Sequence, residues 1–293
     1  MHRSFTSFND DLELKSNFNL HLLNFLIIKD SFSFIEQLHS LKIDTNNTKL
    51  ASFDVTSLFT KVPVRKTIEI ILEKLYGTEH KCTCNKKKRE SWCQNCKNRS
   101  EMRWLLETST QGTHFIFDKN IYVQKNGIAM GSPLGPLFAD IYMNHLENKL
   151  LPELKENGLL FWRRFVDDTF TILKKDSDII KLTEILNSFD EEIVFTSEEE
   201  TNNSIAFLDI LITRVPSNSP KSSFSTTIYR KNTYTGLLTK WQSFVPKSYK
   251  VSAVSTIIYR AIKICSSFKL MHDEFEFIKN ISMKNGYPKK FIE

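Results

Sequence analysis

The chain has 293 residues, of which 41% are hydrophobic and 25% charged, enough to bury a core as one large domain or two small ones. With 8 Gly and 8 Pro beside 23 Phe, the composition excludes collagen-like, low-complexity and wholly disordered chains. The net charge is +6, and this excess lies between Lys81 and Arg103, where eight basic residues accompany two acidic ones. The charge therefore marks one segment without identifying a partner.

Membrane insertion and export are not predicted. The apolar run at residues 20–28 is interrupted by His21 and Asn24 and is shorter than the roughly 20 residues that span a bilayer. It lies too far from the start for a signal peptide, and no small-residue cleavage site follows it. Four of the five cysteines fall within residues 82–96, which favours a reducing compartment and a metal site over a disulfide framework.

The first quarter of the chain predicts two helices around one strand. Residues 1–49 are helical or irregular, with apolar residues at helical spacing over 32–41. Residues 50–55 alternate as in a strand, and residues 67–76 form an amphipathic pattern typical of a helix.

The next segment changes character. Residues 78–100 are polar, basic and rich in Cys, so we interpret them as an insertion. A helix is predicted at 103–109, and a β-hairpin at 113–123 with its turn at Asp118–Asn120. A Gly/Pro loop at 127–136 leads into a strong helix at 137–151.

Strands and helices alternate in the rest of the chain. Strands are predicted at 161–166 and 169–173, with a tight turn at Asp167–Asp168 between them. A helix at 177–189 and strands at 193–196 and 205–214 follow.

A stretch rich in Ser, Pro and Asn at 215–225 indicates a boundary, and the remainder is predicted to be helical. This order predicts an α+β fold with three parts: a helical segment 1–49, a domain 50–215 of antiparallel strands and packed helices, and a helical segment 216–293.

Three aspartates occupy positions suited to chemistry. Asp54 ends an apolar strand, and Asp167 with Asp168 joins two others, so a sheet could bring the three carboxylates together. Clustered carboxylates repel unless a cation intervenes, and Mg²⁺ binds such hard oxygen ligands together with substrate phosphates. Each position alone also fits a helix N-cap or an ordinary turn residue.

Four motifs occur in order along the chain. They are SFDVTSLFTKVP (52–63), NGIAMGSPLGPLFADIYM (126–143), WRRFVDDTF (162–170) and IAFLDILI (205–212). Together they resemble the palm motifs of a reverse transcriptase of the Penelope-like retroelement group, and YRKNTYTG (229–236) is similar to the segment after the palm. The resemblance implies a right-hand polymerase palm followed by a helical, thumb-like segment.

The resemblance also implies roles. Asp54, Asp167 and Asp168 would be the catalytic residues and would hold two Mg²⁺ ions, with the backbone carbonyl of Val55 as a further ligand. Phe59 would exclude ribonucleotides, although an ordinary core Phe is the alternative. Met130, where many reverse transcriptases carry Gln, and Gly131 would contact the incoming nucleotide. Asp209, in contrast, is interpreted as structural.

Basic residues would contact nucleic acid. Arg163 and Arg164 could reach phosphates, with a solvated strand edge as the alternative. In the last segment, basic and aromatic residues interleave, which suits a nucleic-acid interface that includes Arg230 and Lys231. An amphipathic helical bundle with a solvated basic face is the alternative.

The cysteine cluster is a candidate zinc site. Cys82, Cys84, Cys93 and Cys96 could supply the four thiolates of a structural Zn²⁺, with His80 as a substitute ligand. Free cysteines on a basic loop are the alternative.

The resemblance therefore predicts an RNA-directed DNA polymerase that takes an RNA template, a DNA primer and deoxynucleotide triphosphates. The alternative is an inactive, truncated or repurposed fragment that only binds nucleic acid, because no upstream finger motif is found. An intracellular, nuclear location follows from the resemblance alone, and the sequence does not give an oligomeric state.

Overall fold

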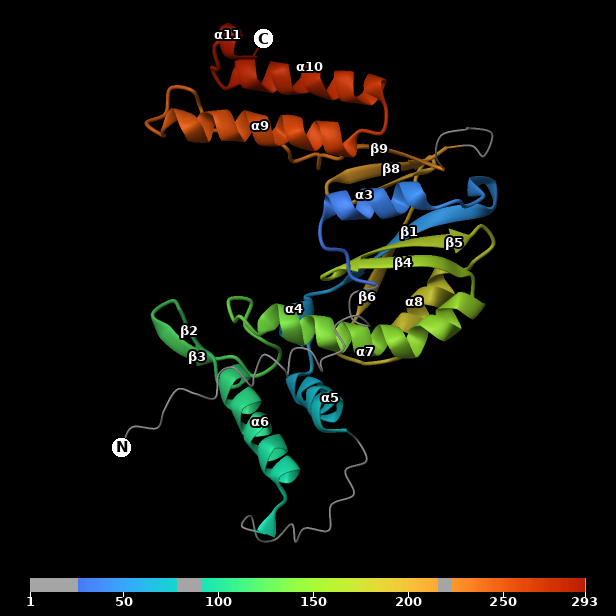
Figure 1. The fold of residues 1–293 in the computed structure, drawn as a ribbon, viewed down its shortest axis with the longest axis vertical. Coiled ribbons are helices and arrows are strands. Elements are labelled where there is room, and N and C mark those ends of the chain that lie inside the picture. Colours follow the sequence, from blue (N-terminus) through green and yellow to red (C-terminus); the bar gives the residue numbers. More distant parts are fainter. Residues whose placement is uncertain (1–25, 78–90, 216–222, 293) are drawn as a thin grey trace. The chain divides into compact units, whose positions relative to one another are not determined.

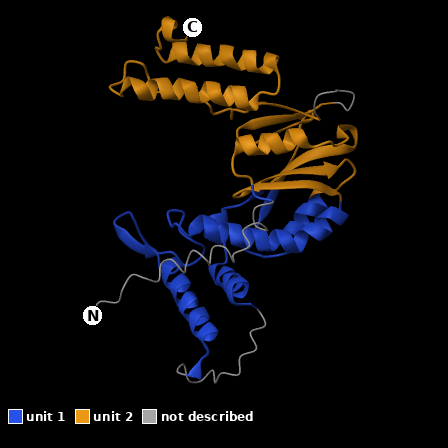
Figure 2. Ribbon diagram, viewed as in Figure 1, with its two compact units in different colours: residues 1–27, 54–157, 180–196 blue, residues 28–53, 158–179, 197–293 orange. Residues whose placement is uncertain are grey.

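The computed structural model describes residues 26–77, 91–215 and 223–292 (Figure 1). The chain folds into two compact units, coloured separately in Figure 2. Unit 1 comprises residues 1–27, 54–157 and 180–196, and unit 2 comprises residues 28–53, 158–179 and 197–293. The units are interleaved along the chain, so neither is one continuous segment.

The larger sheet has strand order β4-β5-β1-β6. Its strands are β1 (Thr48–Val55), β4 (Leu159–Phe165), β5 (Asp168–Lys174) and β6 (Phe195–Glu199). The Lys175 N–H donates to the Asn47 carbonyl at 3.0 Å, and the Thr171 Oγ1 donates to the Ala51 carbonyl at 2.8 Å. From the first bond to the second, the residue number falls by four on the β5 side and rises by four on the β1 side. The two strands therefore run antiparallel.

A second sheet in unit 2 has the order β7-β8-β9. It consists of β7 (Ser204–Phe207), β8 (Ile210–Arg214) and β9 (Phe224–Ile228), all antiparallel. The single strand predicted at 205–214 is wrong because the chain reverses at Leu208–Asp209, where Leu208 has a φ of +56°. The mainly helical segment predicted after residue 216 begins with a strand, since β9 pairs with β8 before the helices α9, α10 and α11.

Helix α3 (Ser31–Ser40) covers apolar side chains of unit 2. Asp30 caps it by accepting the Ser33 N–H at 2.7 Å. The Phe34 ring then meets the edges of Phe170 and Phe207 at centroid distances of 5.2 and 4.9 Å. This aromatic cluster joins residues from both sheets in one core.

The C-terminal helices form a smaller core of their own in unit 2. They are α9 (Lys247–Ile264), α10 (Phe268–Lys284) and α11 (Lys289–Ile292), and Figure 1 shows α9 and α10 side by side. Val254, Ala261, Ile278 and Tyr287 are buried between them.

Unit 1 is mainly helical. Its helices are α4 (Leu58–Lys61), α5 (Val64–Tyr76), α6 (Gln94–Thr110), α7 (Gly135–Glu156) and α8 (Ile179–Asn187). Helix α5 packs against α6 and α7, and its buried side includes Ile68 and Leu72, as the periodicity predicts.

The predicted hairpin is confirmed as β2 (His114–Phe117) and β3 (Asn120–Val123), but its turn is Asp118–Lys119, because Asn120 already pairs with Phe117. Every residue of both strands is exposed. Antiparallel sheets with packed helices thus confirm the α+β fold class. Within the described residues, no helix is both long and apolar enough to cross a membrane.

Candidate active site

The acidic hairpin lies between β4 and β5. Phe165 pairs with Asp168, so the turn consists of Val166 and Asp167, one residue earlier than the Asp167–Asp168 turn predicted from the sequence. Val166 has a φ of +57°, in the left-handed region that a β-branched residue seldom adopts. Asp167 is therefore a turn residue and Asp168 the first residue of β5, and both are half-buried.

Asp54 lies on the exposed side of β1. Phe53 and Val55 on either side of it are each 1% exposed, whereas Asp54 is exposed, as the alternation of a strand requires. Its carboxylate is thus accessible to a ligand, while the side chain of Val55 belongs to the core.

The chemistry of these aspartates suits a magnesium ion, which prefers carboxylate oxygens. In residues 26–77, 91–215 and 223–292, however, no three Asp, Glu, His or Cys side chains are grouped so that they could hold a metal ion. The assignment of magnesium therefore depends on the donor chemistry and on the family resemblance.

A loop of unit 1 folds tightly against Phe59. The Ile128 N–H donates to the Phe59 carbonyl at 2.7 Å. Gly127 has a φ of +69°, and a Cβ at this position would overlap the backbone of Phe59 and Thr60. A Cβ on Gly135 would lie 3.7 Å from the Phe59 ring. Phe59 therefore supports this loop, whatever its effect on nucleotides.

Met130 and Gly131, at the tip of the loop, face solvent. The side chain of Met130 is 69% exposed, which is unusual for a large apolar residue. A Cβ on Gly131 would have no protein atom within 4 Å. Both residues are accessible to a ligand, and their predicted contact with a nucleotide stays a prediction.

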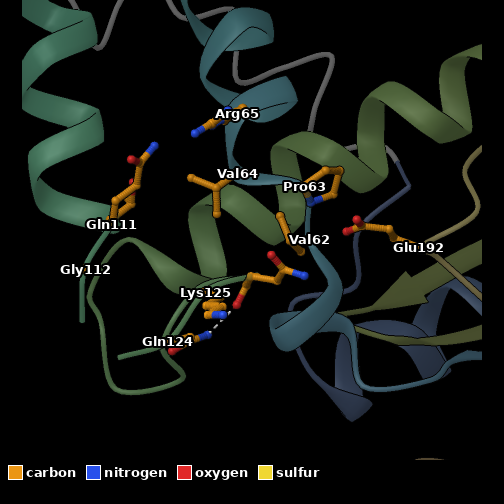
Figure 3. Close-up of a pocket in the computed structure, with 12 residues that line it drawn as sticks. Val62, Pro63, Val64, Arg65, Gln111, Gly112, Gln124, Lys125 and Glu192 are labelled. Carbon is orange, nitrogen blue, oxygen red and sulfur yellow. Dashed lines mark hydrogen bonds between the residues drawn. The ribbon is translucent and has the colours of Figure 1, made fainter. Parts of the chain in front are cut away.

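A cavity of about 510 Å³ opens beside this loop in unit 1 (Figure 3). Its wall comes from the start of α5, the C-terminal end of α6 and the chain that follows β3. Gln124 donates from Nε2 to the Asn126 carbonyl at 2.9 Å within this wall. Arg65, Lys125 and Glu192 supply its charges. No sequence motif marks Arg65, Lys125 or Glu192, whereas Val62, Pro63, Asn126 and Gly127 of the same wall lie within the motifs at 52–63 and 126–143.

The predicted phosphate contact of Arg164 is wrong. Its side chain is 0% exposed, and Nη1 donates to the Val166 carbonyl at 2.8 Å. Strand alternation does not reveal this, because Phe161 and Trp162 lie on opposite faces of β4 and are only 8% and 3% exposed. Arg163 is half-buried and donates from Nε to Gln37 at 2.6 Å, so it too has an internal partner.

The two basic residues after β9 differ in placement. Arg230 forms a two-point ion pair with Glu274, and its guanidinium lies 4.0 Å from the centre of the Phe277 ring. This arrangement indicates a structural role rather than the predicted contact with nucleic acid. Lys231 is exposed, and its contact with nucleic acid stays a prediction.

Half of the candidate zinc site lies in the described part of the chain. Cys93 is the N-cap of α6, and its Sγ accepts the Cys96 N–H at 3.5 Å. Both cysteines are half-buried and reduced. Cys82 and Cys84, as well as His80, lie outside the described residues.

Solved structures of similar fold are polymerases. Telomerase from Candida albicans, in complex with a TWJ fragment of telomeric RNA, has a TM-score of 0.59 at 12% identity and covers 94% of this chain and 46% of its own. Telomerase from Candida tropicalis, in complex with the same kind of fragment, has a TM-score of 0.54 at 11% identity and covers 94% and 44%. An RNA polymerase complex inside a double-stranded RNA virus has a TM-score of 0.51 at 14% identity and covers 96% and 25%.

At these identities the likeness establishes the fold, which is that of a polymerase palm and thumb. The chain spans less than half the length of each of these three structures. A comparison with curated protein sequences finds no match.

The family described as reverse transcriptase (RNA-dependent DNA polymerase) matches residues 13–199. This match covers more than half of the 293 residues, so the chain belongs to the reverse transcriptase family. An animal helix-turn-helix domain matches residues 237–293, the region of α9, α10 and α11.

Proposed function

We propose that this chain catalyses RNA-templated DNA synthesis as a reverse transcriptase of the Penelope-like group. The family match over residues 13–199 carries the proposal. The finer assignment is supported by the four palm-like motifs and is compatible with the animal helix-turn-helix match after them.

In the proposed reaction, the primer 3′-oxygen attacks the α-phosphorus of a deoxynucleotide triphosphate. The new phosphodiester bond forms as the bond to pyrophosphate breaks, and the 3′-hydroxyl loses its proton. Asp54, Asp167 and Asp168 would hold two Mg²⁺ ions together with the Val55 carbonyl. Bound magnesium would stabilise the charge that develops on the attacking and leaving oxygens.

The other predicted residues would select and orient the substrates. Phe59 would exclude the 2′-hydroxyl of a ribonucleotide, and Gly131 would allow the nucleotide to approach the backbone closely. The RNA template and DNA primer would bind through their phosphates, and this binding would weaken with salt.

Primer extension on an RNA template, with Mg²⁺ and deoxynucleotides, tests the proposal. Asp167→Asn should reduce extension to background, because it removes a charged ligand and keeps the shape of the side chain. Asp118→Asn is the matched control, since it removes one charge from the exposed turn between β2 and β3. Salt-sensitive template binding without extension by the unaltered chain would instead indicate a fragment that only binds nucleic acid.

A further inference from the structure

The positively charged guanidinium of Arg164 is buried inside unit 2. Its side chain is 0% exposed and is the largest among the fully buried ones. A buried guanidinium is costly unless it is hydrogen-bonded, and here Nη1 donates to the Val166 carbonyl at 2.8 Å. The backbone carbonyl of Arg164 accepts the Ile28 N–H at 2.8 Å, which fixes the strand on which Arg164 lies.

The carbonyl that Arg164 holds belongs to a strained turn. Val166 has a φ of +57°, where Cβ crowds the backbone. Such a conformation persists only when its surroundings enforce it, and it occurs often at functional sites. The residue that follows Val166 is Asp167.

A second turn in unit 2 has the same form but is held differently. Leu208 has a φ of +56°, and Asp209 follows it, between the paired residues Phe207 and Ile210. There the aspartate itself is engaged, because the Ser31 Oγ donates to it at 2.7 Å and Arg260 pairs with it. In the first turn, Arg164 instead holds a backbone carbonyl, so its hydrogen bond fixes the turn without occupying the Asp167 carboxylate.

We propose that Arg164 is a positioning residue that fixes the Val166–Asp167 turn and thereby the direction of the Asp167 carboxylate. This inference rests on the proposed function, in which Asp167 binds a metal ion. It assigns Arg164 a role through the backbone of the turn and no contact with substrate.

The first test is Arg164→Lys, which keeps the charge but loses the planar donor geometry. The proposal expects faster amide hydrogen exchange across residues 165–168 and weaker Mn²⁺ binding, measured by electron paramagnetic resonance without substrate. In primer extension it expects kcat to fall about tenfold to a hundredfold, with little change in the KM for deoxynucleotides.

Two glycine substitutions show whether the strained turn is responsible. Val166→Gly removes the strain of the positive φ, because glycine tolerates this conformation. In the Arg164→Lys background it should restore at least half of the logarithmic loss in Mn²⁺ affinity and in kcat. Leu208→Gly relieves the same strain in the other hairpin and should restore neither. The proposal is overturned if Arg164→Lys leaves exchange and Mn²⁺ binding unchanged, or if the two glycine substitutions act alike.

The remaining outcomes separate this proposal from the proposed function. If Asp167→Asn leaves Mn²⁺ binding and primer extension unchanged, the proposed function fails. Amide hydrogen exchange across residues 165–168 in Arg164→Lys would still show whether Arg164 fixes the turn. If Arg164→Lys does not fold, Val166→Gly is compared with Val166→Ala, and the glycine variant should have the higher thermal unfolding midpoint because only glycine relieves the positive φ. A lower midpoint for the glycine variant would contradict a strained turn.

Discussion

Arg230 and Glu274 form a largely buried ion pair in which Arg230 Nη1 donates to Glu274 Oε2 at 2.9 Å. A second hydrogen bond joins Nη2 to Oε1, and the side chains are 22% and 7% exposed. The pair links the segment after β9 to α10 within unit 2.

The first prediction concerns Arg230→Ala. Removing one partner leaves the Glu274 charge buried and uncompensated, which should lower the free energy of unfolding by roughly 3 kcal/mol or more. Urea unfolding followed by circular dichroism measures this loss.

Lys231→Ala is the matched control for Arg230→Ala. Because Lys231 is exposed, we expect the free energy of unfolding of the Lys231→Ala variant to differ from that of the unaltered chain by less than about 0.5 kcal/mol. The affinity of this variant for an RNA–DNA hybrid should be lower and should depend less on the salt concentration. If Arg230→Ala instead binds the RNA–DNA hybrid more weakly and keeps its free energy of unfolding, Arg230 contacts nucleic acid as the sequence predicts.

The second prediction concerns acid stability and Asp190 in unit 1. Burial alone would raise the pKa of Asp190, but hydrogen bonds from Lys66 at 2.7 Å and from the Tyr142 hydroxyl outweigh it and lower the pKa. Because the pKa is lower in the folded state, this stabilisation is complete above the unfolded pKa of about 4 and is lost as the pH falls through the folded value.

Asp190→Asn should therefore destabilise the chain at pH 7 by about 1–3 kcal/mol and flatten its loss of stability below about pH 4. Urea midpoints between pH 2 and pH 7 would show this. Equal slopes for the variant and the unaltered chain below pH 4 would exclude Asp190 as the group responsible.

The sequence predicts the long amphipathic elements well and the turns less well. Helix α5 was predicted because Ile68 and Leu72 recur on one face, and both are buried. Turn preferences place the acidic turn one residue too late, because Asp is favoured in turns and Val is not. Pairing of Phe165 with Asp168 overrides that preference and forces Val166 into the left-handed region.

The aspartates and the cations differ in how well sequence reveals them. A local pattern identifies Asp54, Asp167 and Asp168, because they end or begin apolar strands. The burial of Arg164 and the pairing of Arg230 with Glu274, which is 44 residues away along the chain, depend on tertiary packing. Arginine-bearing motifs therefore predict nucleic-acid contacts at positions whose side chains instead stabilise the fold.

The third prediction compares two glycines of the loop at 126–135. Gly127→Ala should destabilise unit 1, because Gly127 has a φ of +69° and an added Cβ would overlap the Phe59 and Thr60 backbone. Gly131→Ala should leave the unfolding midpoint unchanged, since open space surrounds Gly131. Thermal unfolding measures both effects.

Gly131→Ala also tests the predicted nucleotide contact. With the fold intact, Gly131→Ala should raise the KM for deoxynucleotides in primer extension if the nucleotide approaches this backbone. An unchanged KM would remove Gly131 from the nucleotide site.

The fourth prediction concerns zinc and the cysteines at the start of α6. If Cys82, Cys84, Cys93 and Cys96 hold Zn²⁺, the purified chain should contain about one equivalent of zinc. A chelator should release it and expose the thiols to a thiol reagent. Cys96→Ser should lower the zinc content and the zinc affinity, because it removes one of four ligands.

Cys265→Ser is the control for this experiment. Cys265 follows α9, within 3.9 Å of the Thr227 hydroxyl, and burial raises the pKa of its thiol. A neutral, half-buried thiol is a poor metal ligand because the thiolate is the binding form, so Cys265→Ser should retain full zinc. If Cys96→Ser and Cys265→Ser bind zinc equally, the cysteines at 82–96 do not form the site, and Cys93 acts only as a helix cap.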